Sequence, residues 1–167
     1  STGTSAGSTW DSYGIGAVST AGTPTYHQYR DKGDIITEIY VYLDGLTCKG
    51  DAANDIIGLT GGSKPAYIGR YVQANMGLLY KAEVACIEVP GQQTATITTD
   101  IDIAFHTDGT LEYDGAAGTS EINTGGFSNA GDLYIGGFVS APAANDYIYL
   151  TEGDTAATTG EYSTGKL

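Results

Sequence analysis

The stretch that decides the fold is Ile35-Ile-Thr-Glu-Ile-Tyr-Val-Tyr-Leu-Asp44. At a period of two residues, one face carries Ile35, Thr37, Ile39, Val41 and Leu43, and the other carries Ile36, Glu38, Tyr40, Tyr42 and Asp44. This alternation predicts a half-buried β-strand, with one face on a core and the other toward water or a partner. Its β-branched and aromatic residues suit a pleated sheet better than a helix.

More strands are predicted along the chain. Residues 95–106 alternate in the same way, with apolar side chains from Ile97 to Phe105 on one face. Strand character is also found in residues 67–72, 78–89, 133–139 and 147–151. Turn signals such as Asp108-Gly109 separate the runs, and no window has a helical period. The sequence therefore predicts an all-β fold, an antiparallel β-sandwich that is jelly-roll-like.

The domain organisation follows from length and from the first residues. With 167 residues and a mass of 17.3 kDa the chain fits one domain. A Ser/Thr/Gly/Ala run from Ser1 to Thr9 cannot build a core alone, so residues 1–33 are expected to be an extended N-terminal arm. Residues 34–167 are expected to form the single β-sandwich domain. Trp10, Tyr26 and Tyr29 would anchor the arm, on this domain or on a neighbouring subunit.

Charge and cysteine content exclude several classes of partner. The net charge is −13 and only seven residues are Lys or Arg, so neither nucleic acid nor an anionic membrane surface is an expected partner. No apolar run is long enough for a transmembrane helix. Cys48 and Cys86 are too few for a disulfide framework or a zinc site. Cys86 is expected to be a buried free thiol, and a Cys48–Cys86 bridge stays open because geometry decides it.

No catalytic motif is present. Asp100 and Asp102 share a strand face about 7 Å apart, which suits Ca²⁺ or a glycosidase, but paired acids on a wet strand face are ordinary. His106 with Asp108 is half of a triad without a Gly-x-Ser-x-Gly serine, and His27 has no second metal ligand at a suitable spacing. We therefore predict a protein that is not an enzyme, with no catalytic, cofactor-binding or metal-ligating residues and no cofactor.

Tyrosines are the more suggestive set. Tyr40 and Tyr42 lie on the outward face of the central strand, and Tyr147 and Tyr149 do likewise on a later strand if Ile148 and Leu150 point inward. Exposed tyrosines are typical of protein interfaces and of sugar platforms. We favour subunit contact, with sugar binding and plain packing as the alternatives. The interface candidates are Trp10, Tyr26, Tyr29, Tyr40, Tyr42, Tyr147 and Tyr149.

Several fragments occur together in a fixed order: residues 30–39, 55–58, 65–69, 86–90, 142–150 and 160–166. This set resembles small structural proteins of marine tailed bacteriophages, usually uncharacterised. The resemblance runs from about residue 15 to the end and includes no catalytic residues. It implies a virion component on the outer capsid surface, a capsid decoration or cement protein. Its partners would be the major capsid protein and copies of itself, in a homo-oligomer. The alternative is a carbohydrate- or host-surface-binding module of a phage tail or fibre.

The end of the sequence departs from that group. Its members continue past the Gly-Lys dipeptide with a final apolar strand, whereas this sequence stops at Leu167. Either the end is missing or the last strand is lost. We expect an incomplete strand to leave a sheet edge that a neighbour must cover.

Overall fold

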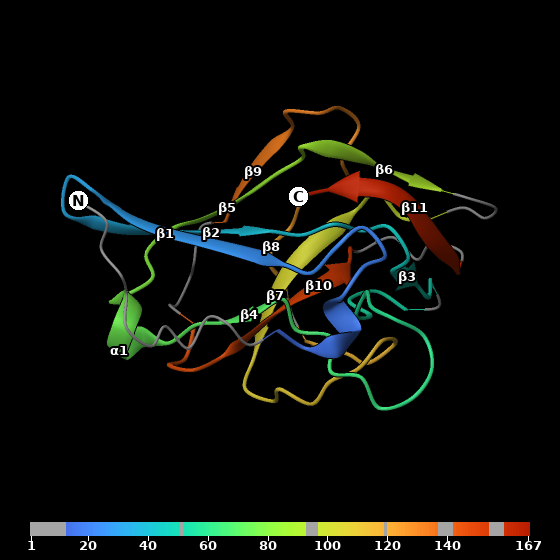
Figure 1. The fold of residues 1–167 in the computed structure, drawn as a ribbon, viewed down its shortest axis with the longest axis horizontal. Helices are drawn as coiled ribbons and strands as arrows, with labels where there is room; N and C mark the ends of the chain where they lie inside the picture. Colours follow the sequence, from blue (N-terminus) through green and yellow to red (C-terminus); the bar gives the residue numbers. More distant parts are fainter. Residues whose placement is uncertain (1–12, 51, 93–96, 119, 137–141, 154–158) are drawn as a thin grey trace.

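The structure is a computed structural model that describes residues 13–50, 52–92, 97–118, 120–136, 142–153 and 159–167. The described chain is nearly all β (Figure 1), with one short helix, α1 (Gln73–Met76), and a 3₁₀ turn at Ile15–Ala17. The strands are β1 (Thr25–Asp31), β2 (Asp34–Tyr40), β3 (Thr47–Cys48), β4 (Gly69–Arg70), β5 (Ala82–Ala85), β6 (Glu88–Gln92), β7 (Ile101–His106), β8 (Ser120–Ile122), β9 (Leu133–Gly136), β10 (Tyr147–Glu152) and β11 (Gly160–Lys166). Every ladder between these strands is antiparallel. The predicted all-β, sandwich-like fold is confirmed.

One layer is the four-stranded sheet β4-β10-β7-β8. β10 and β7 pair from Tyr147 opposite His106 to Glu152 opposite Ile101. Ile148 and Leu150 of β10 point into the main core, whereas Tyr149 packs on the other side of the sheet in a second, smaller cluster. Loop residues Ile56, Ala66 and Ala117 complete that cluster. The central strands of this layer are therefore covered on both faces.

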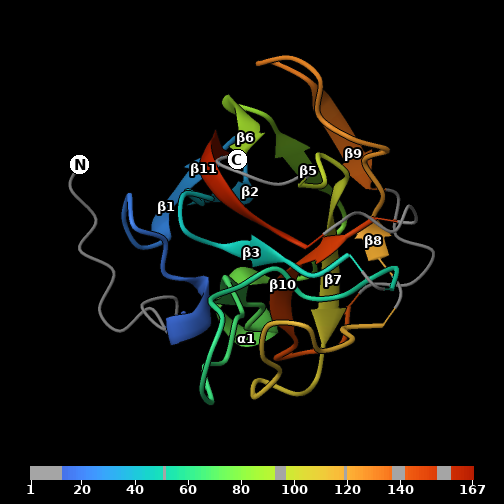
Figure 2. The same ribbon diagram turned by 90° about the vertical axis from the view of Figure 1, so that its right-hand side faces the viewer.

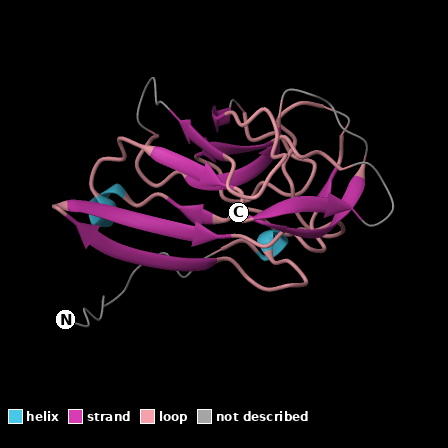
Figure 3. Ribbon diagram, turned by 90° about the horizontal axis from the view of Figure 1, so that it is seen from above, coloured by secondary structure: helices cyan, strands magenta, loops and turns pink. Residues whose placement is uncertain are grey.

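The opposite layer is built around β11 (Figure 2), and Figure 3 shows the strands of the molecule from above, in magenta. One edge of β11 pairs with β6. The first residues of β11 pair with β3 on the other edge. Next to the other edge lie residues 41–43, which follow β2: the N–H groups of Val41 and Leu167 each donate to the carbonyl of the other, both at 3.0 Å. Because β1 pairs with β2 and β9 pairs with β5, which leads into β6, the layer runs β1, β2, β11, β5/β6, β9.

The main core lies between these two layers. It includes Val41, Leu43, Leu46, Val84, Cys86, Ile101, Ile103, Ile122, Phe127, Ile148, Leu150, Tyr162 and Leu167. The predicted inward face of residues 35–44 is confirmed at Val41 and Leu43, which are buried, and at Ile39, which packs on the core. Apolar burial of this kind stabilises the fold by roughly 25 cal/mol per Å².

The described part of the expected arm belongs to the β domain. Residues 25–31 pair with β2 along their whole length, and Lys32-Gly33 forms the turn with positive φ values of 49° and 102°, as a two-residue hairpin requires. The Tyr26 hydroxyl donates to the carbonyl of Ile68. A domain boundary at residue 33 would cut this hairpin at its turn, so the predicted division is wrong there. Trp10 lies outside the described residues.

Residues 14–17 are also fixed on the domain. The N–H of Gly14 donates to the carbonyl of Tyr67 at 2.9 Å, and that of Gly16 donates to Pro65 at 2.7 Å. A Cβ atom at Gly14 would lie 2.0 Å from the Pro65 carbonyl oxygen. Glycine is required there because two backbone segments approach closely.

Candidate interface

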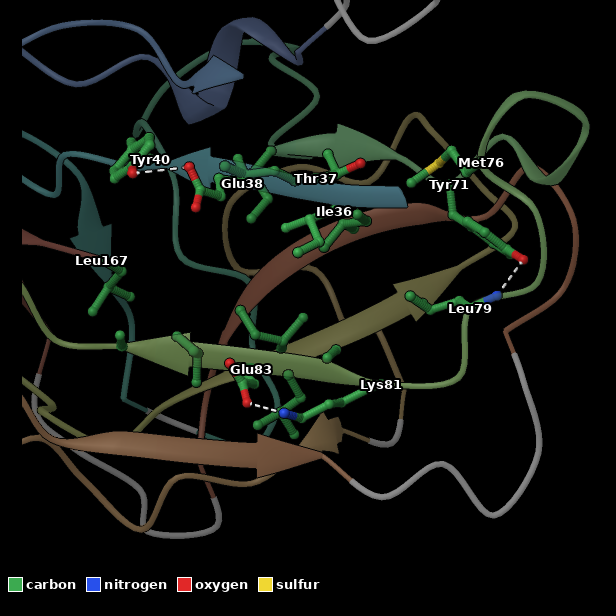
Figure 4. Close-up of a pocket in the computed structure, with 18 of the residues that line it drawn as sticks. Ile36, Thr37, Glu38, Tyr40, Tyr71, Met76, Leu79, Lys81, Glu83 and Leu167 are labelled. Carbon is green, nitrogen blue, oxygen red and sulfur yellow. Dashed lines mark hydrogen bonds and ion pairs between the residues drawn. The ribbon is translucent and has the colours of Figure 1, made fainter. Parts of the chain in front are cut away.

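An apolar groove of about 680 Å³ opens between β2 and β5 (Figure 4). One wall is the whole of β2, and the other wall consists of residues 78–85 and Ile87. The floor is made by side chains of the four-stranded layer and the segments next to it: Ile68, Tyr71, Ile103, Phe105, Ile122, Ile148 and Leu150. Several of these residues belong to the main core. The groove is therefore a gap in the layer built around β11, where the core is open from the side.

β2 presents an open edge to the groove. Antiparallel strands alternate between residues that bond to one neighbour and residues that bond to the other. Val41 bonds to Leu167 on the groove side, so Ile39, Thr37 and Ile35 direct their backbone groups to that side as well. Among the described residues, these three have no backbone hydrogen bond outside the β1–β2 ladder.

β5 presents a second open edge, opposite the first. The N–H of Cys86 donates to the Asp132 carbonyl at 2.9 Å on the β9 side, whereas the N–H of Ile87 donates to the Lys166 carbonyl at 2.9 Å on the β11 side. By the same alternation, Ala85 and Glu83 direct their backbone groups into the groove. Outside the β5–β9 ladder, no backbone hydrogen bond of Glu83 or Ala85 is present in the described chain.

The two ends of the groove are closed. Leu167 fills the end nearest β11, where it lies between the two walls (Figure 4). At the other end, the Tyr80 hydroxyl donates to Asp34 Oδ2 at 2.8 Å and so joins the two walls. The open length of β2 therefore runs from Tyr40 to Ile35, about 20 Å at the usual rise per residue.

Exposed apolar side chains gather along the groove. Of the seven large hydrophobic side chains exposed in the described chain, five line it: Tyr29, Leu78, Tyr80, Ile87 and Leu133. Leu78 and Tyr80 keep 65% and 67% of their surface exposed. Such a concentration of exposed apolar surface marks an interaction site in a soluble protein.

The outer rim of the groove is mainly acidic. Glu38 of β2 and Glu83 of β5 lie on opposite sides of the opening (Figure 4). Lys81 forms an ion pair with Glu83, and the Tyr29 and Tyr40 hydroxyls donate to Glu38 at 3.1 and 3.2 Å. The hydrogen bond from Tyr29 is the main reason that the pKa of Glu38 is lowered. Glu38 is therefore held as a carboxylate.

The predicted interface tyrosines separate into groups. Tyr29 and Tyr40 both bond to Glu38 on the outer side of the β1–β2 hairpin, and Lys166 Nζ lies 5.3 Å and 4.7 Å from the ring centroids of Tyr40 and Tyr42. Cation–π contacts of this geometry hold the rings in place. Tyr26 packs on the core instead and bonds to Ile68, so it anchors the hairpin to this domain.

The late-strand tyrosines do not form an exposed pair. Tyr149 is fully buried, and its hydroxyl donates to the Asp108 carbonyl at 2.7 Å. Burial raises the pKa of Tyr149 well above its ordinary range. Tyr147 is half-buried, 4.8 Å from Tyr67 by ring centroids and 5.0 Å below the Arg70 guanidinium. The predicted exposure of Tyr149 is wrong, because loops cover the outer face of β10.

The acidic candidates have structural roles. Asp102 is fully buried and accepts the Thr124 N–H at 2.8 Å, so the expected wet face of this strand is wrong at that residue. Asp100 accepts the Thr124 hydroxyl at 3.2 Å. His106 Nδ1 accepts the Asp108 N–H at 3.0 Å, an arrangement that leaves no triad geometry. Among the described residues, no group of three or more His, Cys, Asp and Glu could hold a metal ion.

The two cysteines are not joined by a disulfide. Cys48 and Cys86 are both buried, and the Cys48 thiol donates to the Gly160 carbonyl at 3.4 Å. Burial raises the pKa of both thiols, which makes them poor nucleophiles at neutral pH. The expectation of a buried thiol at Cys86 is confirmed.

The sequence pattern did not identify the groove wall at residues 78–87 as a candidate site. The sequence marks them only by breaking the alternation: Leu78, Leu79 and Tyr80 are consecutive, so both faces of the segment carry large apolar groups. A half-buried strand would place polar residues at every second position.

Comparisons with known proteins give no further assignment. None of the helices in the described ranges is long and apolar enough to cross a membrane. No family model, no curated protein and no solved structure matches this chain.

Proposed function

We propose that this protein is a non-enzymatic structural protein of a virion, a capsid decoration or cement protein that bridges capsid subunits on the outer capsid surface. The observation that carries the proposal is the groove between β2 and β5, with its two open strand edges and the exposed apolar side chains that line it. Such a surface fits another protein chain. The major capsid protein would be its main partner, and copies of itself would meet at the Tyr40 and Tyr42 face.

The chemistry of the groove supports a binding role over a catalytic one. Its carboxylates already have partners: Asp34 bonds to Tyr80, Glu38 to Tyr29 and Tyr40, and Glu83 to Lys81. Neither histidine of the chain lines it. A hydrolase would require convergent acid and base groups over a substrate cleft.

Charge and resemblance support the location. A net charge of −13 is compatible with the outside of a nucleic-acid-filled shell, where basic patches have no role. The resemblance of several fragments to structural proteins of tailed bacteriophages supports the same class. A carbohydrate- or host-surface-binding module has less support, because Tyr149 is buried and Tyr147 packs against Tyr67.

Cryo-electron microscopy of particles from the natural source tests the location. We expect density for this chain at regular positions on the capsid shell. Density on a tail or fibre, or its absence from every particle, would overturn the decoration role and favour the carbohydrate- or host-surface-binding alternative.

Binding to particles that lack the protein tests the surface. We expect wild-type protein to cosediment with them saturably, and Leu78→Lys to weaken that binding at least about tenfold, because a charge replaces exposed apolar surface at the groove. Glu161→Lys, at an exposed residue of β11 that does not line the groove, is the matched control and should bind like wild type. Equal binding by both variants would contradict the groove as the contact surface.

A further inference from the structure

We propose that the groove takes up one β-strand from a partner protein. This strand runs in line with β11 and completes the layer built around β11, between β2 and β5. This inference names the partner chemistry for the proposed assembly function and rests on it. The occupant is an extended segment of about six residues, apolar at every second residue.

The backbone geometry allows one strand in this place. At the closed end, Val41 bonds to Leu167 and Ile87 bonds to Lys166, so within the described ranges the end of β11 is the only strand between the two walls at that level. β2 and β5 extend from there along the groove (Figure 1), and each directs open backbone groups toward the other. A strand in line with β11 would therefore bond to both edges at once.

Direction and register follow from β11. β11 is antiparallel to β6 and to residues 41–43, so an occupant in line with it is antiparallel to both walls. Continuing the Val41–Leu167 pair by steps of two places occupant residues opposite Ile39, Thr37 and Ile35 in hydrogen-bonded pairs. The Tyr80–Asp34 bridge ends the groove there, which limits the segment to about six residues.

Side-chain preferences follow from the register. Residues directly opposite one another point to the same face of a sheet. Occupant residues opposite Ile39 and Thr37 therefore point to the apolar floor, as Leu167 does beside Val41, and must be apolar. The residue opposite Glu38 points outward between Glu38 and Glu83, where a Lys or Arg side chain is favoured.

A second copy of this chain is a poor donor. The stretches with long apolar alternation, residues 35–44 and 97–106, supply strands or buried residues of its own fold, and so do residues 147–151. A copy could donate them only by losing its own core. In the sequence from Ser1 to Thr9, Ala6 is the only apolar residue apart from glycine. Because residues 1–167 offer no free alternating segment, we assign the occupant to a different protein.

The first test uses a synthetic peptide and the 167-residue chain. The peptide has about seven residues, with Ile or Val at every second position and Thr or Lys between them. Its control has the same composition with the apolar residues grouped together. We expect the alternating peptide to bind at least about tenfold more tightly by calorimetry. Equal affinity of the two peptides, or no binding, would overturn the proposal.

Amide hydrogen exchange identifies the edges that are used. Bound peptide should slow exchange at Ile35, Thr37 and Ile39, whereas Ile36 and Glu38, already bonded to β1, should change little. Slowing at Glu83 and Ala85 would show that the second edge is used too. Protection confined to other strands would contradict strand insertion.

Variants test the position of the strand. Thr37→Lys places a charge over the apolar floor and should weaken peptide binding at least about tenfold. Thr164→Lys, the same change at an exposed residue of β11 that does not line the groove, is the matched control and should bind normally. The amide spectrum of each variant checks that the fold is retained. Equal weakening of peptide binding by both variants would assign the effect to charge alone and would overturn the groove as the binding site.

Protein purified from the natural source identifies the donor. We expect it to take up the peptide once its partner has been removed. If it refuses the peptide while the 167-residue chain accepts it, another strand of the same molecule fills the groove, and the partner source is wrong. Failure of the capsid role with intact peptide binding would overturn only the proposed function, so the two failures are distinguishable.

Discussion

β10 and β2 are both alternating strands, yet they lie in opposite environments. β10 has a strand on each side, β4 and β7, and loops cover its outer face over Tyr149. β2 has β1 on one side and the groove on the other, and none of its residues from Asp34 to Tyr40 is fully buried. The difference shows that alternation identifies a strand but not how many of its edges and faces the chain itself will cover.

The largest loss of stability should come from a large-to-small substitution in the core at β10. Leu150→Ala removes a fully buried side chain between the layers, which should lower the free energy of unfolding by about 2–5 kcal/mol. Ile36→Ala, at a half-exposed residue of β2, should lower it by less than about 1 kcal/mol. Urea unfolding measures both, and equal losses would remove the contrast between the two strands.

Proline substitutions in β2 test its open edge. Thr37→Pro removes an N–H that faces the groove, whereas Glu38→Pro removes an N–H bonded to β1. We expect Glu38→Pro to be more destabilising by at least about 1 kcal/mol, since it breaks a ladder hydrogen bond. Thermal unfolding measures the difference. A larger loss for Thr37→Pro would mean that the edge is already paired.

Tyr26→Phe tests how the hairpin is held on the core. The substitution removes the hydroxyl that donates to the Ile68 carbonyl while keeping the ring packed. We expect a loss of about 1 kcal/mol. Tyr29→Phe, at an exposed tyrosine of the same strand, should lower the free energy of unfolding by less. Urea unfolding measures both variants. No loss at Tyr26 would mean that packing alone positions the hairpin.

The smallest effect concerns protonation on the outer face of β2. Hydrogen bonds, above all from Tyr29, lower the pKa of Glu38 below its ordinary value of 4.5. The stability contributed by the Glu38 carboxylate is therefore present above pH 4.5 and is lost as the pH falls through the lowered pKa. Tyr29→Phe should raise that pKa. An NMR titration of the Glu38 carboxyl carbon measures it, and an unchanged midpoint in the variant would contradict the assigned cause.

Parts of the fold could be predicted because local pattern and environment agree. The apolar alternation of residues 35–44 and 95–106 led directly to β2 and β7. β11 is not among the predicted strands, because Gly160 and Gly165 and several polar residues hide a strand whose burial comes from its neighbours. β1 was assigned to an arm for a similar reason, since all of its residues but Tyr26 are exposed.

The candidate interface could be predicted only in fragments. Tyr29 and Tyr40 were identified by their chemistry, and both line the groove. The groove itself arises where β11 ends between Val41 and Ile87, two residues far apart in the sequence. No local pattern reports that two strand edges will stay open. The burial of Tyr149 was likewise set by distant loops around Ile56 and Ala66.

The pairing of Val41 with Leu167 also constrains how the protein folds. The two residues are 126 positions apart (167 − 41), so the contact closes a very long loop. Proteins dominated by such non-local pairings fold slowly, on the scale of milliseconds to seconds. Before β11 is in place, Val41, Ile87 and the apolar surface beneath them have no strand between them. The newly made chain is therefore open to aggregation through the same surface for longer than a protein of local contacts would be.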